Sequence, residues 1–217
     1  GNIRTEGTYK NDIMVGVMKS YYEDGTLQLE STRKENGQNG ISKNYYKDGT
    51  LSGESTYSYE NPNDKWTEYL FKTSKSYNED GRLEQKETRD NRGVSNGPHI
   101  QYYLAPKYKN NDGDRLESTR VNEDIEGPAV YYWADGDREE RTYVNNIVEG
   151  PAVYYYADGR REERTYVNGK QEGSAVFYAS DSGKWKGDRE EFTYVNGKQE
   201  GPSVYYWVNG NREERTY

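Results

Sequence analysis

A short turn signal recurs along this chain at a nearly regular interval. The signal is a glycine preceded by Asp, Asn or, once, Lys, and successive copies lie 23 to 32 residues apart. The eight glycines are Gly25, Gly49, Gly81, Gly113, Gly136, Gly159, Gly187 and Gly210. Asp-Gly and Asn-Gly pairs are typical of tight β-hairpin turns, and a period of this length is typical of a repeat array. The chain is therefore expected to consist of eight copies of a unit of about 23 residues.

Other residue types recur at fixed distances from this glycine. A tyrosine lies four residues before it in six copies, and Tyr102 and Tyr178 hold the equivalent place in two copies that carry insertions. A threonine lies six or seven residues after the glycine, and a glutamate usually lies two residues before that threonine. Each unit is therefore predicted to be a strand, a tight turn, a second strand and a linking turn.

Residues 150–172 form the clearest copy. Side chains alternate along a strand, so Val153 and Tyr155 are expected on one face and Tyr154 and Tyr156 on the other. The second strand is expected to place three residues on one face and two on the opposite one, namely Glu163, Thr165 and Val167 against Arg164 and Tyr166. Stacked hairpins are then expected to align like residues into cross-strand ladders, tyrosine on tyrosine and threonine on threonine.

The composition limits how thick the fold can be. Hydrophobic residues make up 30% of the chain, charged residues 31%, and the mean hydropathy is -1.34. A thick core needs more Leu, Ile, Val and Phe than this, whereas an aromatic content of 14% is high for a disordered chain. Tyrosine, with an apolar ring and a polar hydroxyl, suits a sheet one layer thick. The predicted fold is all-β, an elongated single-layer sheet of tandem β-hairpin repeats.

The repeats predict a single array over residues 1–217. It is expected to comprise a half repeat at 1–15 and eight repeats at 16–217, with insertions near 58–70, 104–112 and 180–187. Loops extended on one edge of a regular solenoid often carry function. Tolerated variation at loop tips is the other interpretation of these insertions.

Charge and cysteine content argue against several function classes. The net charge is -8 and no basic cluster stands out, so nucleic acid and anionic membrane surfaces are not expected as partners. One histidine and no cysteine provide no transition-metal site and no Ser-His or Cys-His pair. No apolar run approaches the length of a transmembrane span. We expect neither a cofactor nor a catalytic residue.

The repeating unit resembles the MORN repeat, specifically its bacterial variant. The unit reads Gly-x-x-x-x-Tyr-Tyr-x-Asp-Gly-x-x-x-x-Glu-x-Thr-Tyr-x-Asn-Gly and is clearest at 127–149, 150–172 and 201–217. The copies at 16–39 and 40–57 keep Tyr-Tyr-x-Asp-Gly. The resemblance implies a MORN-like solenoid of stacked hairpins, contact roles toward protein or lipid, and no catalytic residues of its own. It also implies a surface, secreted or antitoxin-like bacterial protein.

Choline-binding repeats of bacterial cell-wall proteins are similar as well, since they too are hairpins rich in Tyr-Tyr. Their aromatic cages use a Gly-Trp pair in the linking turn. This chain has Gly-Pro-Ala-Val there in its clearest copies and contains only four tryptophans. A cage for a quaternary ammonium group is therefore not expected.

Two recurring rows of side chains are candidate sites. The tyrosine row is either a set of structural ladders or an aromatic strip that binds a glycan or peptide. The candidate binding residues are Tyr132, Trp133, Tyr155, Tyr156, Trp185, Tyr206 and Trp207. Among them Tyr156 and its tryptophan counterparts vary between copies and are the better binding candidates. The Glu-x-Thr row is either a polar face neutralised by neighbouring arginines, as in 138–141, or a carboxylate groove for a basic partner.

The sequence thus predicts a non-enzymatic binding or scaffold module that mediates protein–protein interaction. A bacterial surface or secreted location is expected, with the cytoplasm as the other possibility. One alternative function is carbohydrate or cell-wall binding through the aromatic strip, and another is an antitoxin-like neutraliser. Edge strands without a cap also allow end-to-end self-association.

Overall fold

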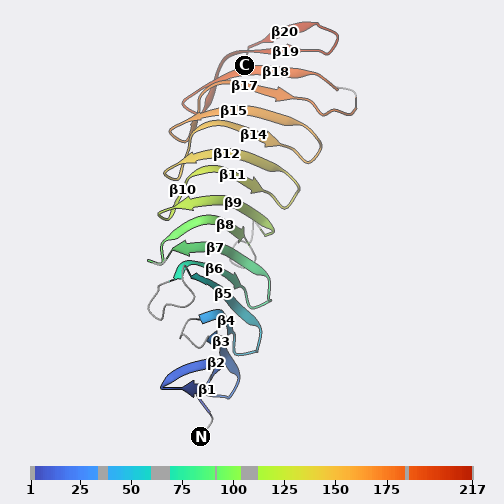
Figure 1. The fold of residues 1–217 in the computed structure, drawn as a ribbon. Coiled ribbons are helices and arrows are strands. Elements are labelled where there is room, and N and C mark those ends of the chain that lie inside the picture. Colours follow the sequence, from blue (N-terminus) through green and yellow to red (C-terminus); the bar gives the residue numbers. More distant parts are fainter. Residues whose placement is uncertain are drawn as a thin grey trace. The chain divides into compact units, whose positions relative to one another are not determined.

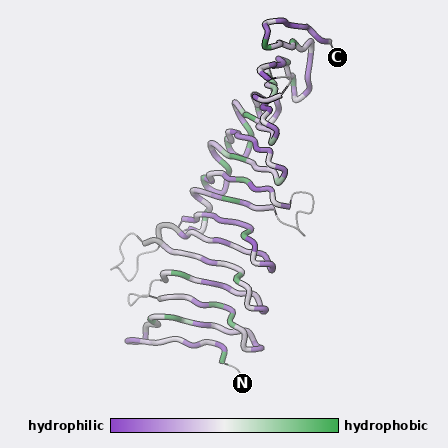
Figure 2. Tube along the Cα trace, turned by 90° about the vertical axis from the view of Figure 1, so that its right-hand side faces the viewer, coloured by the Kyte–Doolittle hydropathy of each residue, from purple (hydrophilic) through white to green (hydrophobic). Residues whose placement is uncertain are grey.

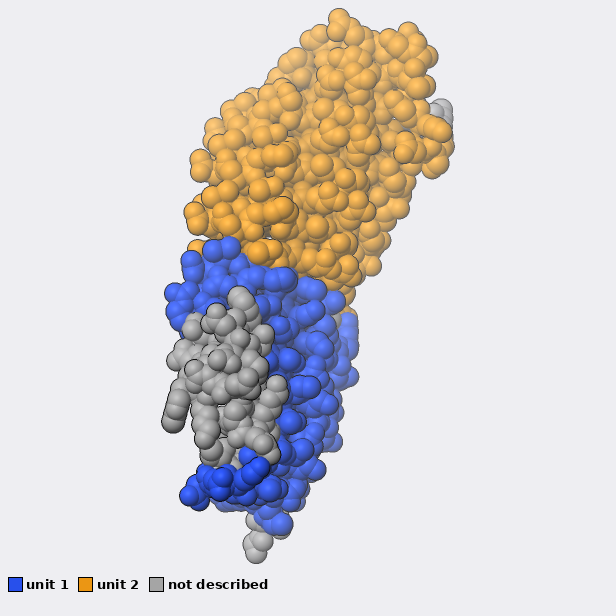
Figure 3. Space-filling view, in the orientation of Figure 1, with its two compact units in different colours: residues 1–102, 120–123 blue, residues 103–119, 124–217 orange. Residues whose placement is uncertain are grey.

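A computed structural model describes residues 3–33, 39–59, 69–90, 92–103, 112–183 and 186–216. Within these ranges the chain forms 20 strands and no helix, which confirms the all-β prediction. Consecutive strands pair antiparallel, hairpin after hairpin (Figure 1). The strands fall into two compact units, Gly1–Tyr102 with Arg120–Glu123, and Tyr103–Thr119 with Asp124–Tyr217 (Figure 3). Among the described residues no helix is long and apolar enough to cross a membrane.

Unit 1 is a meander of long hairpins. Its strands are β1 (Thr5–Lys10), β2 (Ile13–Tyr21), β3 (Leu27–Arg33), β4 (Asn39–Tyr45), β5 (Leu51–Tyr59), β6 (Tyr69–Tyr77), β7 (Leu83–Asp90) and β8 (Ser95–Tyr103). Each of its three Asp-Gly hairpins has a shift in register just before a terminal Tyr–Leu pair. The pairs are Tyr21↔Leu27, Tyr45↔Leu51 and Tyr77↔Leu83. This bulge distinguishes the hairpins of unit 1 from those of unit 2.

Unit 2 repeats a more regular hairpin. Its strands are β9 (Asp114–Val121), β10 (Asp124–Ile125), β11 (Gly127–Tyr132), β12 (Arg138–Val144), β13 (Ile147–Val148), β14 (Gly150–Tyr155), β15 (Arg161–Val167), β16 (Lys170–Gln171), β17 (Gly173–Tyr178), β18 (Arg189–Val195), β19 (Lys198–Tyr206) and β20 (Arg212–Arg215). The terminal pair is now Tyr–Arg, with no register shift inside the hairpin. The four pairs are Tyr132↔Arg138, Tyr155↔Arg161, Tyr178↔Arg189 and Tyr206↔Arg212.

In the hairpins whose turns carry no insertion, two backbone hydrogen bonds close the Asp-Gly or Asn-Gly turn. In the 127–149 repeat, the Gly136 N–H donates to the Trp133 carbonyl oxygen at 3.1 Å, and the Trp133 N–H donates to the Asp137 carbonyl oxygen at 2.9 Å. Gly136 has a φ of 98°. The glycine therefore follows the two central turn residues in the left-handed region and forms a bulge, rather than being a central residue of a two-residue turn.

The linking turn is the two-residue type that an Asn-Gly pair predicts. Asn168 and Gly169 have φ values of 52° and 76°, as a type I′ turn requires. The side chain of Glu149, from the preceding linking turn, accepts a 2.7 Å hydrogen bond from the Asn168 N–H. The next repeat has the same contact between Glu172 and Asn196, also at 2.7 Å. Each linking turn is therefore fixed to the one before it.

The sheet has few buried apolar side chains. Among the described residues those buried are Leu116, Ala129, Ala152 and Ala175. Ala152 lies opposite Arg164 and Ala129 opposite Arg141, so a small residue on one strand faces a long one on the next. Figure 2 shows apolar residues as short stretches along the strands. A single layer that buries aliphatic stems and ring faces explains how so polar a chain can fold.

The predicted like-on-like ladders are wrong for Tyr155 and Thr165. Tyr155 pairs with Arg138 on one side and Arg161 on the other, and Thr165 pairs with Pro151. The tyrosine at the position of Tyr155 occurs once per hairpin, that is, once per two strands. The strand in between therefore supplies a different residue type, and here it supplies a cation. The predicted repeat boundaries, 1–15 and 16–217, stay a prediction, and most of the insertions at 58–70 and 104–112 lies outside the described residues.

Candidate binding face

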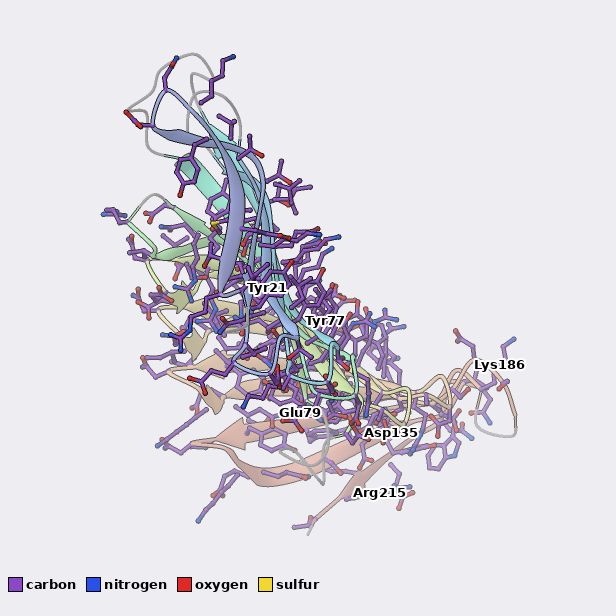
Figure 4. The ribbon with its side chains drawn as sticks, turned by 90° about the horizontal axis from the view of Figure 1, so that it is seen from below. Tyr21, Tyr77, Glu79, Asp135, Lys186 and Arg215 are labelled. Atoms are coloured by element: carbon purple, nitrogen blue, oxygen red, sulfur yellow. The ribbon has the colours of Figure 1, made fainter. Side chains whose placement is uncertain are left out.

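The two faces of unit 2 carry different chemistry. Side chains project from both sides of its strands (Figure 4). In the 150–172 repeat Tyr155 faces the arginines of neighbouring strands. Tyr154 and Tyr156 share the opposite face, where their ring centroids lie 4.6 Å apart. The predicted alternation of Tyr154, Tyr155 and Tyr156 is therefore confirmed.

One face carries a run of aromatic rings, which we call the aromatic row. Its members are Tyr103, Tyr131, Trp133, Tyr154, Tyr156, Phe177, Tyr205 and Trp207. Within a hairpin the centroid distance is 4.6 Å for Tyr131–Trp133 and 5.0 Å for Tyr205–Trp207. From one hairpin to the next it is 5.0 Å for Trp133–Tyr154 and 6.1 Å for Tyr156–Phe177. These are the separations of tilted and edge-to-face pairs.

Aspartates fix the row from its edge. Asp137 accepts a hydrogen bond from the Tyr154 hydroxyl at 2.6 Å and another from the Ala157 N–H at 2.8 Å. Asp114 makes the same two bonds with Tyr131 and Ala134, and Asp188 makes them with Tyr205 and Val208. Burial, and then the hydrogen bond to Asp137, raise the pKa of Tyr154 well above its ordinary value. The rings are therefore held neutral and in fixed orientations.

Buried charges lie beside the rings on the same face. Glu139 is 2% exposed and accepts a hydrogen bond from the Arg141 Nε at 2.8 Å. Arg164 Nη1 lies 3.9 Å from Glu139, and Arg164 Nη2 donates to Glu162 at 2.6 Å. Burial, the largest single effect, opposes the charge of Arg164, but the hydrogen bond and charge of Glu162 together with Tyr166 outweigh it and raise the pKa of the guanidinium. The guanidinium of Arg164 also lies over the Tyr154 ring, 5.2 Å from its centroid.

The opposite face carries alternating arginine and tyrosine, which we call the Arg–Tyr row. Arg138 lies over Tyr155 and Arg161 over Tyr178, with the guanidinium carbon 4.0 Å from the ring centroid in both pairs. Each arginine also pairs with the glutamate two residues further on. The N–O distances are 2.8 Å for Arg115–Glu117, 3.3 Å for Arg138–Glu140, 3.3 Å for Arg161–Glu163 and 3.0 Å for Arg189–Glu191. This network favours the structural interpretation of the Glu-x-Thr row.

The structure divides the candidate binding residues between these two faces. Tyr132, Tyr155 and Tyr206 belong to the Arg–Tyr row. Trp133, Tyr156 and Trp207 belong to the aromatic row. Trp185 lies outside the described residues.

Sequence reasoning missed five members of the aromatic row, Tyr103, Tyr131, Tyr154, Phe177 and Tyr205. The signal that identifies them is the alternation itself. Residues two apart in a strand share a face, so the partner of Trp133 is Tyr131 and not the adjacent Tyr132.

The aromatic row has a hollow where Ala179 replaces a ring. The cavity measures about 440 Å³ and is lined by Arg160, Phe177, Ala179, Tyr205, Trp207 and Arg215. Figure 4 labels Arg215 on β20. The cavity volume lies within the range of about 300–1,000 Å³ that is usual for small-ligand pockets. Among the described residues no group of His, Cys, Asp or Glu side chains could hold a metal ion.

The comparisons with known proteins point to one repeat family. The MORN repeat variant matches residues 14–35 and 38–59. The MORN repeat matches residues 124–138, 142–160, 165–184 and 193–212. The first set lies in unit 1 and the second in unit 2. No curated protein matches the chain.

Solved structures share little more than a general likeness. The TCP domain of Drosophila melanogaster SAS-4 (dCPAP), solved in complex with a proline-rich motif of Ana2 (dSTIL), is 12% identical, with a TM-score of 0.40 over 93% of this chain and 90% of that one. A TcdB2-TccC3-TEV structure is 10% identical, with a TM-score of 0.27 over 94% of this chain and 13% of that one. At these TM-scores neither similarity supports a conclusion about function.

Proposed function

The chain belongs to the MORN repeat family, and from this premise we propose that it is a non-catalytic module that binds a protein partner through the aromatic row of unit 2. MORN repeats are in general binding or scaffold modules. The proposal adds two points to this general role, namely that the partner is a protein and that it binds to the aromatic row.

The observation that carries the proposal is the composition and order of the aromatic row. Tyr, Trp and Arg are the residue types that contribute most to protein–protein binding energy. Here they lie together on one face, with rings in mutual contact from Tyr103 to Phe177. Side chains that are already ordered lose little conformational entropy when a partner binds. The row is therefore better prepared for binding than the Arg–Tyr row, in which a guanidinium already lies over each ring.

The test compares the two faces. Replacing Trp133→Ala and Trp207→Ala together removes two members of the aromatic row, whereas Val144→Ala changes an exposed residue outside it. We expect a partner isolated by cross-linking with the wild-type protein to lose at least tenfold in affinity with the double variant. The Val144 variant should retain the full affinity. Equal binding to all three proteins would place the interface elsewhere.

Carbohydrate binding is the second candidate, because the hollow beside Trp207 offers ring faces on which a sugar could pack. Glycan-array binding that saturates and disappears with Trp207→Ala would favour it, above all if no protein partner is captured. The proposal also includes a bacterial surface or secreted location, for which the resemblance noted above is the support. Fractionation of cells that express the native gene tests that location.

A further inference from the structure

The aromatic row is interrupted at one position. In the copies of unit 2 the residue after the strand-end tyrosine pair is a ring, as in Trp133, Tyr156 and Trp207. The third copy has Ala179 there, and the rings of Phe177 and Tyr205 end on either side of the gap. The hollow of about 440 Å³ described above lies at this gap, and we call it the slot.

Two further residues depart from the repeat at the same place. Arg160 stands where three other copies have an aspartate and the last has Asn211, and Phe177 stands where those three have the tyrosine that donates to the aspartate. A guanidinium cannot accept a hydroxyl hydrogen bond, so the loss of the hydroxyl in Phe177 matches the change at Arg160. Ala179, Arg160 and Phe177 thus all depart from the repeat at one junction between hairpins. Their coincidence indicates a linked local change rather than unrelated substitutions.

The exchange also replaces a carboxylate at the edge of the row with a guanidinium, which pairs with Asp158 at 2.7 Å. Asp114, Asp137 and Asp188 place carboxylates beside the other rings. At the slot, the guanidinium of Arg160 lies 4.7 Å from the Tyr156 centroid and 5.8 Å from that of Phe177. Arg215 lies 4.4 Å from the Tyr205 centroid on the other side. Cations that already stack on rings at both ends favour an electron-rich ring between them.

We propose that the slot receives a tryptophan or tyrosine side chain of a protein partner, which completes the aromatic row. The hairpin of β11 and β12 shows the arrangement that such a ring would reproduce. Trp133 lies 4.6 Å from Tyr131 and 5.0 Å from Tyr154. A ring above Ala179 would contact Phe177 and Tyr205 in the same way. The inference rests on the proposed function, because it takes the occupant from a protein.

Filling the slot from within is the direct test. Ala179→Tyr and Ala179→Trp supply the missing ring, and Val144→Ala, at an exposed position outside the slot, is the control. The probes are N-acetyl-tryptophanamide, followed by NMR, and 12-residue peptides selected on the wild-type protein from a random displayed library. We expect peptides enriched in Trp or Tyr that bind the wild-type and Val144→Ala proteins equally. They should bind the Tyr and Trp proteins at least tenfold more weakly.

Arg160 gives an independent test. Arg160→Asp combined with Phe177→Tyr restores the usual pair of the repeat and leaves Ala179 unchanged. A loss of about fivefold in peptide affinity is expected, the size of a partly exposed cation–π contact. An unchanged affinity would show that Arg160 does not contribute to binding in the slot.

Several results would overturn the inference. Selected peptides without an aromatic residue, or peptides that bind Ala179→Tyr as well as the wild type, would contradict it. Binding only of oligosaccharides or of proline-rich peptides would assign another occupant. Absence of both selected peptides and N-acetyl-tryptophanamide shifts would leave the slot without a ligand. A partner that is lost with Trp133→Ala and Trp207→Ala but kept with Ala179→Tyr would refute the slot and leave the proposed function standing.

Discussion

Two adjacent glutamates show how differently identical residues are used. Glu139 is 2% exposed, bonded to Arg141, near Arg164, and 3.5 Å from the Tyr166 hydroxyl. Glu140 lies on the other face and pairs with Arg138 at 3.3 Å, with both side chains more than two-fifths exposed. The sequence Glu-Glu does not indicate which one is buried until the face of each strand is known.

Glu139→Ala is therefore expected to be much more destabilising than Glu140→Ala. Removing Glu139 leaves the partly buried guanidinium of Arg141 without its carboxylate, while Arg164 keeps Glu162. Breaking such a pair costs about 3–5 kcal/mol when it is fully buried. Removing Glu140 breaks an exposed pair worth about 0–1 kcal/mol. Urea unfolding of the two variants measures the difference. Equal midpoints would show that the charges on the aromatic face are well solvated.

His99 gives the fold of unit 1 a pH dependence. It is 4% exposed, and burial, followed by Arg120, lowers its pKa to about 4. Glu87 lies opposite it in the sheet and Gln85 Nε2 lies 3.2 Å from its Nε2. Its charged surroundings also include Arg89 and Glu123. The ring is therefore neutral in the folded protein at pH 7.

Below the unfolded pKa of about 6.5 the unfolded chain binds a proton at this residue and the folded chain does not. The free energy of unfolding should therefore fall as the pH drops from about 6.5 toward 4, by an amount on the order of 2 kcal/mol. His99→Gln should remove this part of the pH dependence. Urea unfolding at pH 7.5 and 5.0 measures it, and parallel pH profiles of the two proteins would contradict the assignment.

At the scale of the hairpin, alternation and turn chemistry predicted most of what is observed. The Asn168-Gly169 turn, the alternating faces of Tyr154 to Tyr156 and the order of strands follow from the sequence. Cross-strand partners do not, because they depend on the register between hairpins. The Arg–Tyr row shows this, since Arg138 and Tyr155 are 17 positions apart in the sequence and meet only across the linking turn.

The aromatic row and its slot were harder to foresee for a related reason. Ala179 is unremarkable in sequence, and Ala157 also follows a tyrosine. Its meaning comes from comparing it with Trp133, Tyr156 and Trp207 at the same position of other copies. The linked changes at Arg160 and Phe177 become visible only when Asp137 is seen to accept the Tyr154 hydroxyl.

Gly169 provides a test of the linking turn. Its φ of 76° is costly for a side chain with a β carbon, by about 1–2 kcal/mol, and Asn tolerates this region better. The preceding linking turn has Asn146 at the same place, with a φ of 65°. Gly169→Val should therefore lower the thermal midpoint, and Gly169→Asn should leave it nearly unchanged. Equal losses for both variants would mean that space, rather than backbone conformation, limits this position.

At the scale of the whole chain, the two kinds of MORN match coincide with two kinds of hairpin. The variant form matches residues 14–59 in two copies, where the strand-end tyrosine pairs with leucine after a bulge. The other form matches between 124 and 212, where it pairs with arginine and no bulge intervenes. Sequence subtype and hairpin register therefore change together along the chain.

Near-identical repeats should also be interchangeable. Repeats 127–149 and 150–172 have the same strand register and the same contacts of linking glutamate with asparagine. In a repeat array, stability is close to a sum of repeats and of interfaces between neighbours. Deleting residues 150–172 joins Glu149 to Gly173 and keeps every turn in step. The shortened protein should fold with the same strand content in circular dichroism and a moderately lower thermal midpoint.

The deletion would also place Asp137 at the position that Arg160 occupies beside Phe177, while Ala179, Tyr205 and Trp207 stay in place. The deletion is therefore expected to affect the stability of the fold and the affinity for peptides differently. The fold should survive because any two copies fit together, whereas affinity for the selected aromatic peptides should fall about fivefold, as with Arg160→Asp. A misfolded product would show that the junction between 150–172 and its neighbours is specific, whereas a folded product with full affinity would show that Arg160 does not contribute to the slot.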